Sequence, residues 1–143
     1  MTKSKIKSNI TDKKNIFKKA IELKEYPIFY SKHLTTNKKY NFNYFNNEKE
    51  QIIVKSIILE EILRLQEKTW VEWGIENKKT GYESIPITQI NIIPKNLILP
   101  NDIKTIVFRI NSQKWRLIGI RSMHFKSVIH IIGFDFDYTA YKH

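Results

Sequence analysis

The sequence predicts an α+β fold in which helices pack on one face of an antiparallel sheet. Three observations lead to this class. The 143 residues, 41% of them apolar, suffice for one domain with a hydrophobic core. Residues 47–68 have the apolar content of a buried helix, and residues 103–143 read as consecutive strands. We therefore expect a compact domain at residues 40–143, preceded by a basic N-terminal arm at residues 1–39.

The C-terminal third predicts a three-stranded meander. Apolar side chains alternate with others along residues 106–111 and 115–120, and residues 127–134 form an almost continuous β-branched run. The breaks at residues 111–114 and 121–124 are short. They allow only antiparallel hairpins, because a parallel return needs about a dozen residues or more.

The N-terminal arm is predicted to hold one helix. Thr11 and Asp12 can cap a helix that runs to about Glu25, with lysines opposite an apolar stripe, and Pro27 ends it. The residues before this helix are polar and rich in lysine, which is typical of disorder. They lack the apolar segment of a secretory signal, so we expect none. Residues 28–30 read either as a strand or as a docking segment.

A strand and a long helix are expected next. Aromatic residues alternate with asparagine over residues 40–45, which is typical of a half-buried strand. Asn47 and Glu50 have the spacing of a capping box. The helix that follows should end between residues 66 and 68. Because its apolar residues cover more than one face, it is predicted to be largely buried against the sheet.

The region after the long helix is expected to be less regular. Thr69 can cap a short helix whose Trp70 and Trp73 share one face, where core packing is favoured over base stacking. Prolines interrupt the apolar residues 85–99, so these are predicted to be edge or extended segments. A short helix is expected near residues 95–99.

The net charge of +11 indicates a polyanionic partner, of which nucleic acid is the commonest. Residues 1–39 contain eleven lysines against three acidic residues, and three of the four arginines lie on the predicted meander. Arginine offers a fixed fork of donors that suits phosphate. An AT-rich genome that fills surfaces with lysine is the alternative explanation. The candidate RNA-binding residues are Lys104, Lys114, Arg121 and Lys126.

Several kinds of site are excluded. The chain has no cysteine, which excludes disulfides, thiolate zinc sites and a thiol nucleophile, and fits a reducing cytosol. It also lacks a phosphate loop, a zinc-protease motif, a nucleophile elbow and any stretch of about 20 apolar residues. A structural role for His124 and His130 is favoured over a metal site. We therefore expect a cytoplasmic protein with no metal, no cofactor and no membrane partner.

A pattern of short motifs runs through the end of the chain. A strand with a basic residue (residues 107–110) is followed by an aromatic-arginine-aliphatic strand (residues 115–118), then by an aliphatic strand that ends at Gly133, and finally by Tyr141. This pattern resembles the end of the RelE/YoeB-type toxins, which are small basic ribonucleases that cut messenger RNA on the ribosome. Their plan of a strand, a helical hairpin and a meander is similar to that expected for residues 40–143.

The resemblance implies a catalytic set and partners. Arg109 falls at the basic position of the first meander strand, and Arg116 matches the arginine that holds the substrate phosphate. Tyr141 matches the C-terminal tyrosine that orients or activates the attacking ribose hydroxyl, and His143 can fill the role of a terminal histidine. No metal is implied, because the 2′-hydroxyl attacks the neighbouring phosphorus. The implied partners are RNA or the ribosome, and an acidic antitoxin protein.

One departure from the family pattern leaves other functions open. The family has a basic stretch with a catalytic arginine after the glycine, whereas this chain has Asp135 and Asp137, which would repel a scissile phosphate. In a purely structural interpretation, these aspartates cap the end of the last strand and the aromatic tail packs on the core. The alternatives are a non-catalytic nucleic-acid-binding module and a protein-binding domain of mobile-element or defence origin.

Overall fold

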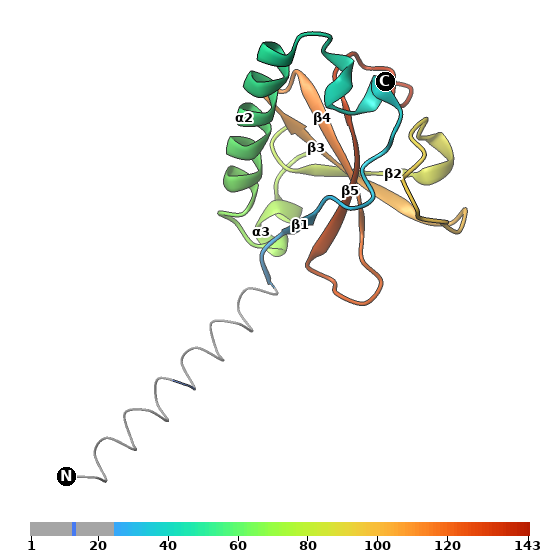
Figure 1. The fold of residues 1–143 in the computed structure, drawn as a ribbon. Helices are drawn as coiled ribbons and strands as arrows, with labels where there is room; N and C mark the ends of the chain where they lie inside the picture. The colour runs from blue at the N-terminus through green and yellow to red at the C-terminus, as the bar shows by residue number, and fades with distance from the viewer. Residues whose placement is uncertain (1–12, 14–24) are drawn as a thin grey trace, which may run out of the picture.

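A computed structural model describes Lys13 and residues 25–143, and within them five strands form one mixed sheet (Figure 1). The predicted helix from Thr11 to about Glu25, and with it most of the basic arm, lies outside the described residues. The strand order is β1-β5-β4-β3-β2. The α+β class is confirmed. The strands are β1 (Ile28–Tyr30), β2 (Tyr82–Pro86), β3 (Lys104–Ile110), β4 (Trp115–Arg121) and β5 (Val128–Asp135).

The sheet is mixed because its first strand runs parallel to its last. β3 pairs antiparallel with β2 and β4, and β4 pairs antiparallel with β5. β1 lies along the other edge of β5 in parallel register, so the prediction of an antiparallel sheet is wrong at this edge. The direction of β1 is favoured by local contacts: Ile28 N donates to Ser127 O at 2.9 Å, and the Phe29 ring lies 6.2 Å from that of Phe108.

Two α-helices begin at the predicted caps. In α2 (Glu48–Leu65), the Asn47 side chain accepts a hydrogen bond from Glu50 N at 3.2 Å. In α3 (Trp70–Ile75), Thr69 and Glu72 form a complete capping box. Each cap satisfies backbone N–H groups that have no partner within the helix. No helix in the described part of the chain is long and apolar enough to cross a membrane.

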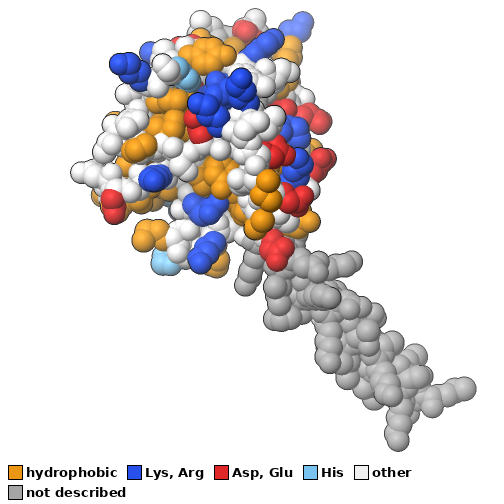
Figure 2. Space-filling view, turned by 180° about the vertical axis from the view of Figure 1, so that it is seen from behind, with side chains coloured by type: hydrophobic (Ala, Val, Ile, Leu, Met, Phe, Trp, Pro, Cys, Tyr) orange, Lys and Arg blue, Asp and Glu red, His pale blue; other side chains and the backbone are white. Residues whose placement is uncertain are grey.

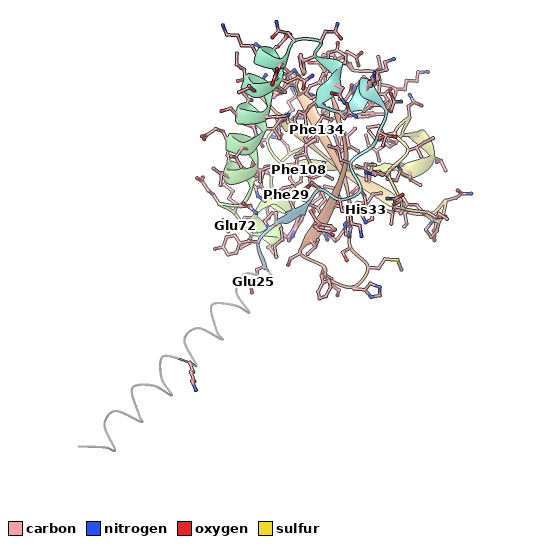
Figure 3. The ribbon with its side chains drawn as sticks, in the orientation of Figure 1. Glu25, Phe29, His33, Glu72, Phe108 and Phe134 are labelled. Carbon is pink, nitrogen blue, oxygen red and sulfur yellow. The ribbon has the colours of Figure 1, made fainter. Side chains whose placement is uncertain are left out.

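The first face of the sheet packs against α2 and α3. Phe108 is fully buried at its centre, among the aromatic rings of Phe29, Trp70, Trp73 and Tyr82. Figure 3 shows Phe108 and Phe29 close together in this layer. Trp73 also donates its indole N–H to Leu65 O at 2.7 Å, which joins α3 to the end of α2. The predicted core role of the tryptophan pair is confirmed.

The second face of the sheet is covered by irregular chain. The segment 87–103 and the C-terminal tail pack on Val107, Ile118 and Ile132. Gly133 permits this close approach, because a Cβ there would lie 2.8 Å from the Cδ1 atom of Ile92. The short helix expected near residues 95–99 is absent, and this segment contains only the 3-10 turn η4 (Ile87–Gln89) instead.

Two further expectations are wrong. Residues 40–45 do not form a strand. They belong to the 3-10 turns η2 (Lys38–Tyr40) and η3 (Phe42–Tyr44), because the Asn37 and Asn41 side chains accept hydrogen bonds from backbone N–H groups two residues on. Helix α2 is also not largely buried, because the sheet covers only one of its sides. Four of its apolar side chains are more than half exposed: Ile52, Ile53, Leu59 and Leu63.

Candidate functional site

The candidate site is centred on Arg116, on the sheet face opposite α2. Arg109, Arg116 and Asp135 lie side by side in register on β3, β4 and β5. Arg116 is only 5% exposed. Its Nη1 donates to the carbonyl of Gln113 at 2.7 Å and to that of Trp115 at 3.1 Å. The ring of Tyr138 lies 5.2 Å from its guanidinium carbon. Arg116 is therefore held in place by backbone carbonyls and lies beneath an aromatic ring.

The buried Asp135 carboxylate folds the tail over this arginine. Asp135 Oδ1 accepts a hydrogen bond from Thr139 N at 3.1 Å, and Oδ2 accepts one from Ala140 N at 3.2 Å. His143 Nε2 lies 3.6 Å from the same Oδ2. These contacts bring the rings of Tyr141 and His143 within 4.2 Å of each other. The carboxylate thus binds tail N–H groups, as the structural interpretation of the aspartates expects.

Tyr141 keeps its proton at neutral pH. The residue is 8% exposed, and its hydroxyl donates to Glu83 Oε1 at 3.0 Å. Burial raises the pKa of Tyr141 to about 12, while the Arg116 guanidinium acts in the opposite direction and Glu83 adds to the rise. A phenol with this pKa is a poor general base. Its hydroxyl can donate a hydrogen bond, as it does to the Glu83 carboxylate.

Glu83 is the site residue that sequence reasoning missed. It lies on the edge strand β2, and its carboxylate reaches the site because Glu83 pairs in register with Val107. Side chains two positions apart on a strand lie on the same face, so a strand here would place Glu83 on the face of the buried Ile85. The sequence contains no signal for the register between β2 and β3, so it does not bring Glu83 to Tyr141.

The other predicted residues separate into two groups. Arg109 and Lys114 lie near the β3–β4 turn, at the same end of the sheet as Arg116. Lys104, Arg121 and Lys126 lie at the opposite end of β3 and β4, about 20 Å away along the strands. Figure 2 shows basic side chains spread over the face seen from behind, with acidic ones most frequent along one edge. The basic residues therefore do not form one compact patch.

Arg109 occupies a separate hollow. It is the cross-strand partner of Arg116. It also lines a cavity of about 390 Å³ with residues of α2 and of the segment after α3. The structure thus brings Arg116, Tyr141 and His143 together with Glu83, and places the Arg109 side chain next to this cluster.

Backbone strain is concentrated around Arg116. Asn111, Ser112 and Gln113 have φ values of 51°, 52° and 68°, and Tyr138 has a φ of 61°. Gln113 supplies the carbonyl that Arg116 binds, and Tyr138 supplies the ring above it. Non-glycine residues in this left-handed region cost about 1–3 kcal/mol each and often occur at functional sites.

Replacing Gln113 with glycine should stabilise the protein. Glycine adopts positive φ without steric cost, and the Gln113 side chain is exposed. We expect a gain of about 0.5–1 kcal/mol, because the relief of strain exceeds the added entropy of the unfolded chain. Urea denaturation would measure it. Lys114→Gly is the matched control, since Lys114 lacks a positive φ and should lose stability. Equal losses of stability in both variants would contradict the inference that the backbone at Gln113 is strained.

A second histidine pair lies away from the site. The rings of His33 and His130 are 5.2 Å apart, between the η2 connection and β5; Figure 3 labels His33. His33 Nδ1 donates to Lys95 O at 2.8 Å, whereas His130 Nδ1 is buried and has no hydrogen-bond partner among the described residues. Burial, followed by the neighbouring His33, lowers the pKa of His130.

Acid should therefore destabilise the fold through His130. The unfolded chain binds this proton near pH 6.5, above the folded-state pKa, so stability falls as the pH drops below about 7. We expect His130→Gln to lose less stability than the wild type between pH 7.5 and pH 5.5, measured by urea unfolding at each pH. Identical losses in the two proteins would show that His130 contributes nothing.

Comparison with models of protein families, with curated proteins and with solved structures finds no match to this chain.

Proposed function

We propose that the protein is a metal-independent endoribonuclease of the RelE-like kind, or a degenerate relative, that acts on messenger RNA. One observation carries this proposal. Glu83, Tyr141 and His143 gather around the buried Arg116 on one face of the sheet. This arrangement offers a carboxylate and an imidazole that both contact one phenol, with a permanent positive charge nearby.

The chemistry needs only groups of the protein and the substrate. Glu83 Oε2 accepts the proton of a ribose 2′-hydroxyl, whose oxygen attacks the adjacent phosphorus. The bond from phosphorus to the 5′-oxygen breaks, and the protonated His143 ring donates a proton to that oxygen. The products are a 2′,3′-cyclic phosphate and a 5′-hydroxyl. The positive charge of Arg116 favours the negative charge that develops on the phosphoryl oxygens, while the Tyr141 hydroxyl holds Glu83 in position.

Asp135 does not argue against this scheme. Its carboxylate is 1% exposed and accepts hydrogen bonds from the N–H groups of Thr139 and Ala140. These donors, together with the neighbouring Arg116, offset its charge. Its repulsion of a phosphate at the surface is therefore weaker than that of a free aspartate. The exposed Tyr138 ring, next to His143, offers a surface on which a base can stack.

The test is cleavage of messenger RNA by the purified chain. Labelled RNA would be incubated with and without translating ribosomes in the presence of EDTA, and the product ends would be identified. We expect cuts with cyclic phosphate ends, most frequent on the ribosome. Intact RNA in both settings, together with normal growth of cells that express the protein, would rule out the proposal.

A non-catalytic nucleic-acid-binding module is the second candidate. The observation in its favour is that the Tyr141 hydroxyl already binds Glu83 and that Arg116 is buried. Such a module would use the exposed cations Lys104, Lys114, Arg121 and Lys126. Binding that weakens steeply with salt, without any cleavage, would favour it.

The proposed partners follow from the first function. RNA or the ribosome is the partner, an acidic antitoxin protein is the regulator, and the cytoplasm is the compartment. A small acidic reading frame next to the gene would support the antitoxin. Co-purification of its product with this chain would test the pairing.

A further inference from the structure

The cavity that contains Arg109 is rich in cations. It lies between the C-terminal half of α2, the segment after α3 and the β3–β4 turn. Four basic side chains line it against only two carboxylates, Glu61 and Glu76. Its volume of about 390 Å³ is large enough for a phosphate group with its sugar.

Both carboxylates are already paired. Glu61 accepts hydrogen bonds from Arg64 Nη2 at 2.7 Å and from Arg64 Nε at 3.3 Å. Glu76 pairs with Lys68, and this hydrogen bond, with help from Thr80, holds the pKa of Glu76 below its usual value. The two carboxylates are therefore not free to neutralise further cations.

The paired cations are also fixed in position. The Lys68 Nζ lies 4.9 Å from the centre of the Trp73 ring, and the Arg64 guanidinium carbon lies 5.8 Å from it. Trp73 is itself buried and bound to Leu65 O. On one wall of the cavity, both ion pairs therefore lie against an aromatic ring.

Two cations remain without an acidic partner in the described part of the chain: Arg109 and Lys79. The Nε atom of Arg109 is buried and has no hydrogen-bond partner among these residues. Leaving such a donor unsatisfied is costly, and an anion is the ligand that satisfies a guanidinium best. The strained β3–β4 turn places the hydroxyl-bearing Ser112 at the same cavity.

We propose that this cavity binds a backbone phosphate of a single-stranded RNA through Arg109 and Lys79. A diester phosphate carries one negative charge and free oxygens that match the arginine fork. The site adjoins the Arg116 cluster, because Arg109 and Arg116 are cross-strand partners. A strand passing around this end of the sheet would place one phosphate in the cavity and another, further along the strand, at Glu83 and His143. The identity of the strand rests on the proposed function, whereas the phosphate site itself does not.

The test measures binding without cleavage. The probe is a fluorescent 2′-O-methyl RNA oligonucleotide without terminal phosphates, titrated with the full chain at several salt concentrations. We expect Arg109→Gln and Lys79→Gln each to weaken binding on the order of tenfold. Each should also reduce the slope of log affinity against log salt by about 0.7, the value of one single-strand phosphate contact.

A matched control removes one charge elsewhere. Lys49 is exposed at the opposite end of α2, so Lys49→Gln should bind the probe almost like the wild type. If Arg109→Gln and Lys79→Gln behave like Lys49→Gln, the phosphate site is wrong. Lys79 is exposed, so its substitution tests the site even if Arg109→Gln unfolds.

Two further measurements separate this site from other outcomes. In the first, inorganic phosphate or a free nucleotide competes with the bound oligonucleotide. If either one displaces the oligonucleotide at a concentration below that of the oligonucleotide, the cavity is a small-molecule site and the backbone-phosphate site is contradicted. Cleavage of unmodified RNA is scored separately. If the wild type binds through Arg109 and Lys79 but cuts nothing, the ribonuclease proposal fails and the phosphate site stands.

Discussion

Asp135→Ala should lose about 3 kcal/mol of folding free energy, measured by urea unfolding. The carboxylate is buried and accepts hydrogen bonds from the N–H groups of Thr139 and Ala140. Alanine leaves these donors without their acceptor, and each unsatisfied buried group costs about 1–3 kcal/mol. Total stability for a domain of this size is about 5–15 kcal/mol, so the loss is a large fraction of it.

Asp137→Ala is the matched control for this substitution. Asp137 is two residues away and less buried, and its carboxylate accepts a hydrogen bond only from the Thr139 hydroxyl among the described residues. It should lose about 1 kcal/mol or less. The loss of folding free energy in Asp135→Asn should lie between those of the two alanine variants, because the amide oxygen retains part of the acceptor capacity. Equal stability of Asp135→Ala and the wild type would show that the carboxylate does not hold the tail.

His143→Ala and Glu83→Gln should each lower the rate of RNA cleavage by about 10²–10⁴-fold. Each removes one of the two groups that move a proton in the proposed reaction. The effect should appear in the single-turnover rate at saturating protein, while affinity for a 2′-O-methyl RNA stays within a factor of about two. Tyr141→Phe should reduce the rate less, because the hydroxyl orients Glu83 and does not accept a proton.

The neighbouring Lys142 provides the control for position. It is exposed at the same end of the chain, so Lys142→Ala should retain most of the activity. Thermal unfolding would confirm that all four variants are folded. A His143→Ala protein that cleaves as fast as Lys142→Ala would remove the histidine from the mechanism.

Local chemistry explains what the sequence could predict. The starts of α2 and α3 were predictable because a cap is a contact between residues three apart, as in Thr69 and Glu72. Strands β3 and β4 lie within stretches of period-two alternation, and β5 lies within a continuous β-branched run; both patterns are typical of strands. Arg109, Arg116, Tyr141 and His143 were expected to share one hollow; Arg116, Tyr141 and His143 lie close together, whereas Arg109 lines a separate cavity.

Long-range geometry explains what the sequence could not predict. Glu83 reaches Tyr141 from 58 positions away along the chain, through a strand register that no local pattern encodes. The parallel placement of β1 beside β5 is of the same kind. The strand expected at residues 40–45 failed for a local reason, because asparagine side chains that bind the backbone outweighed the aromatic alternation.

The burial of α2 was overestimated for a third reason. Apolar content predicts burial only where a second layer exists to cover the helix, and in the described residues the sheet covers one side of α2. Arg109 shows another limit of prediction from the sequence. Its place in the strand was predictable from alternation, but its position at the cavity beside the β3–β4 turn was not.

The most direct test of the central claim compares two forms of the same oligonucleotide. Unmodified RNA and its 2′-O-methyl counterpart would be incubated with the wild-type protein in EDTA, with binding and cleavage measured together. The account predicts equal binding of both, cleavage of the unmodified RNA alone, and 2′,3′-cyclic phosphate ends. Unmodified RNA that stays intact, or a 2′-O-methyl RNA that is cut equally fast, would contradict it.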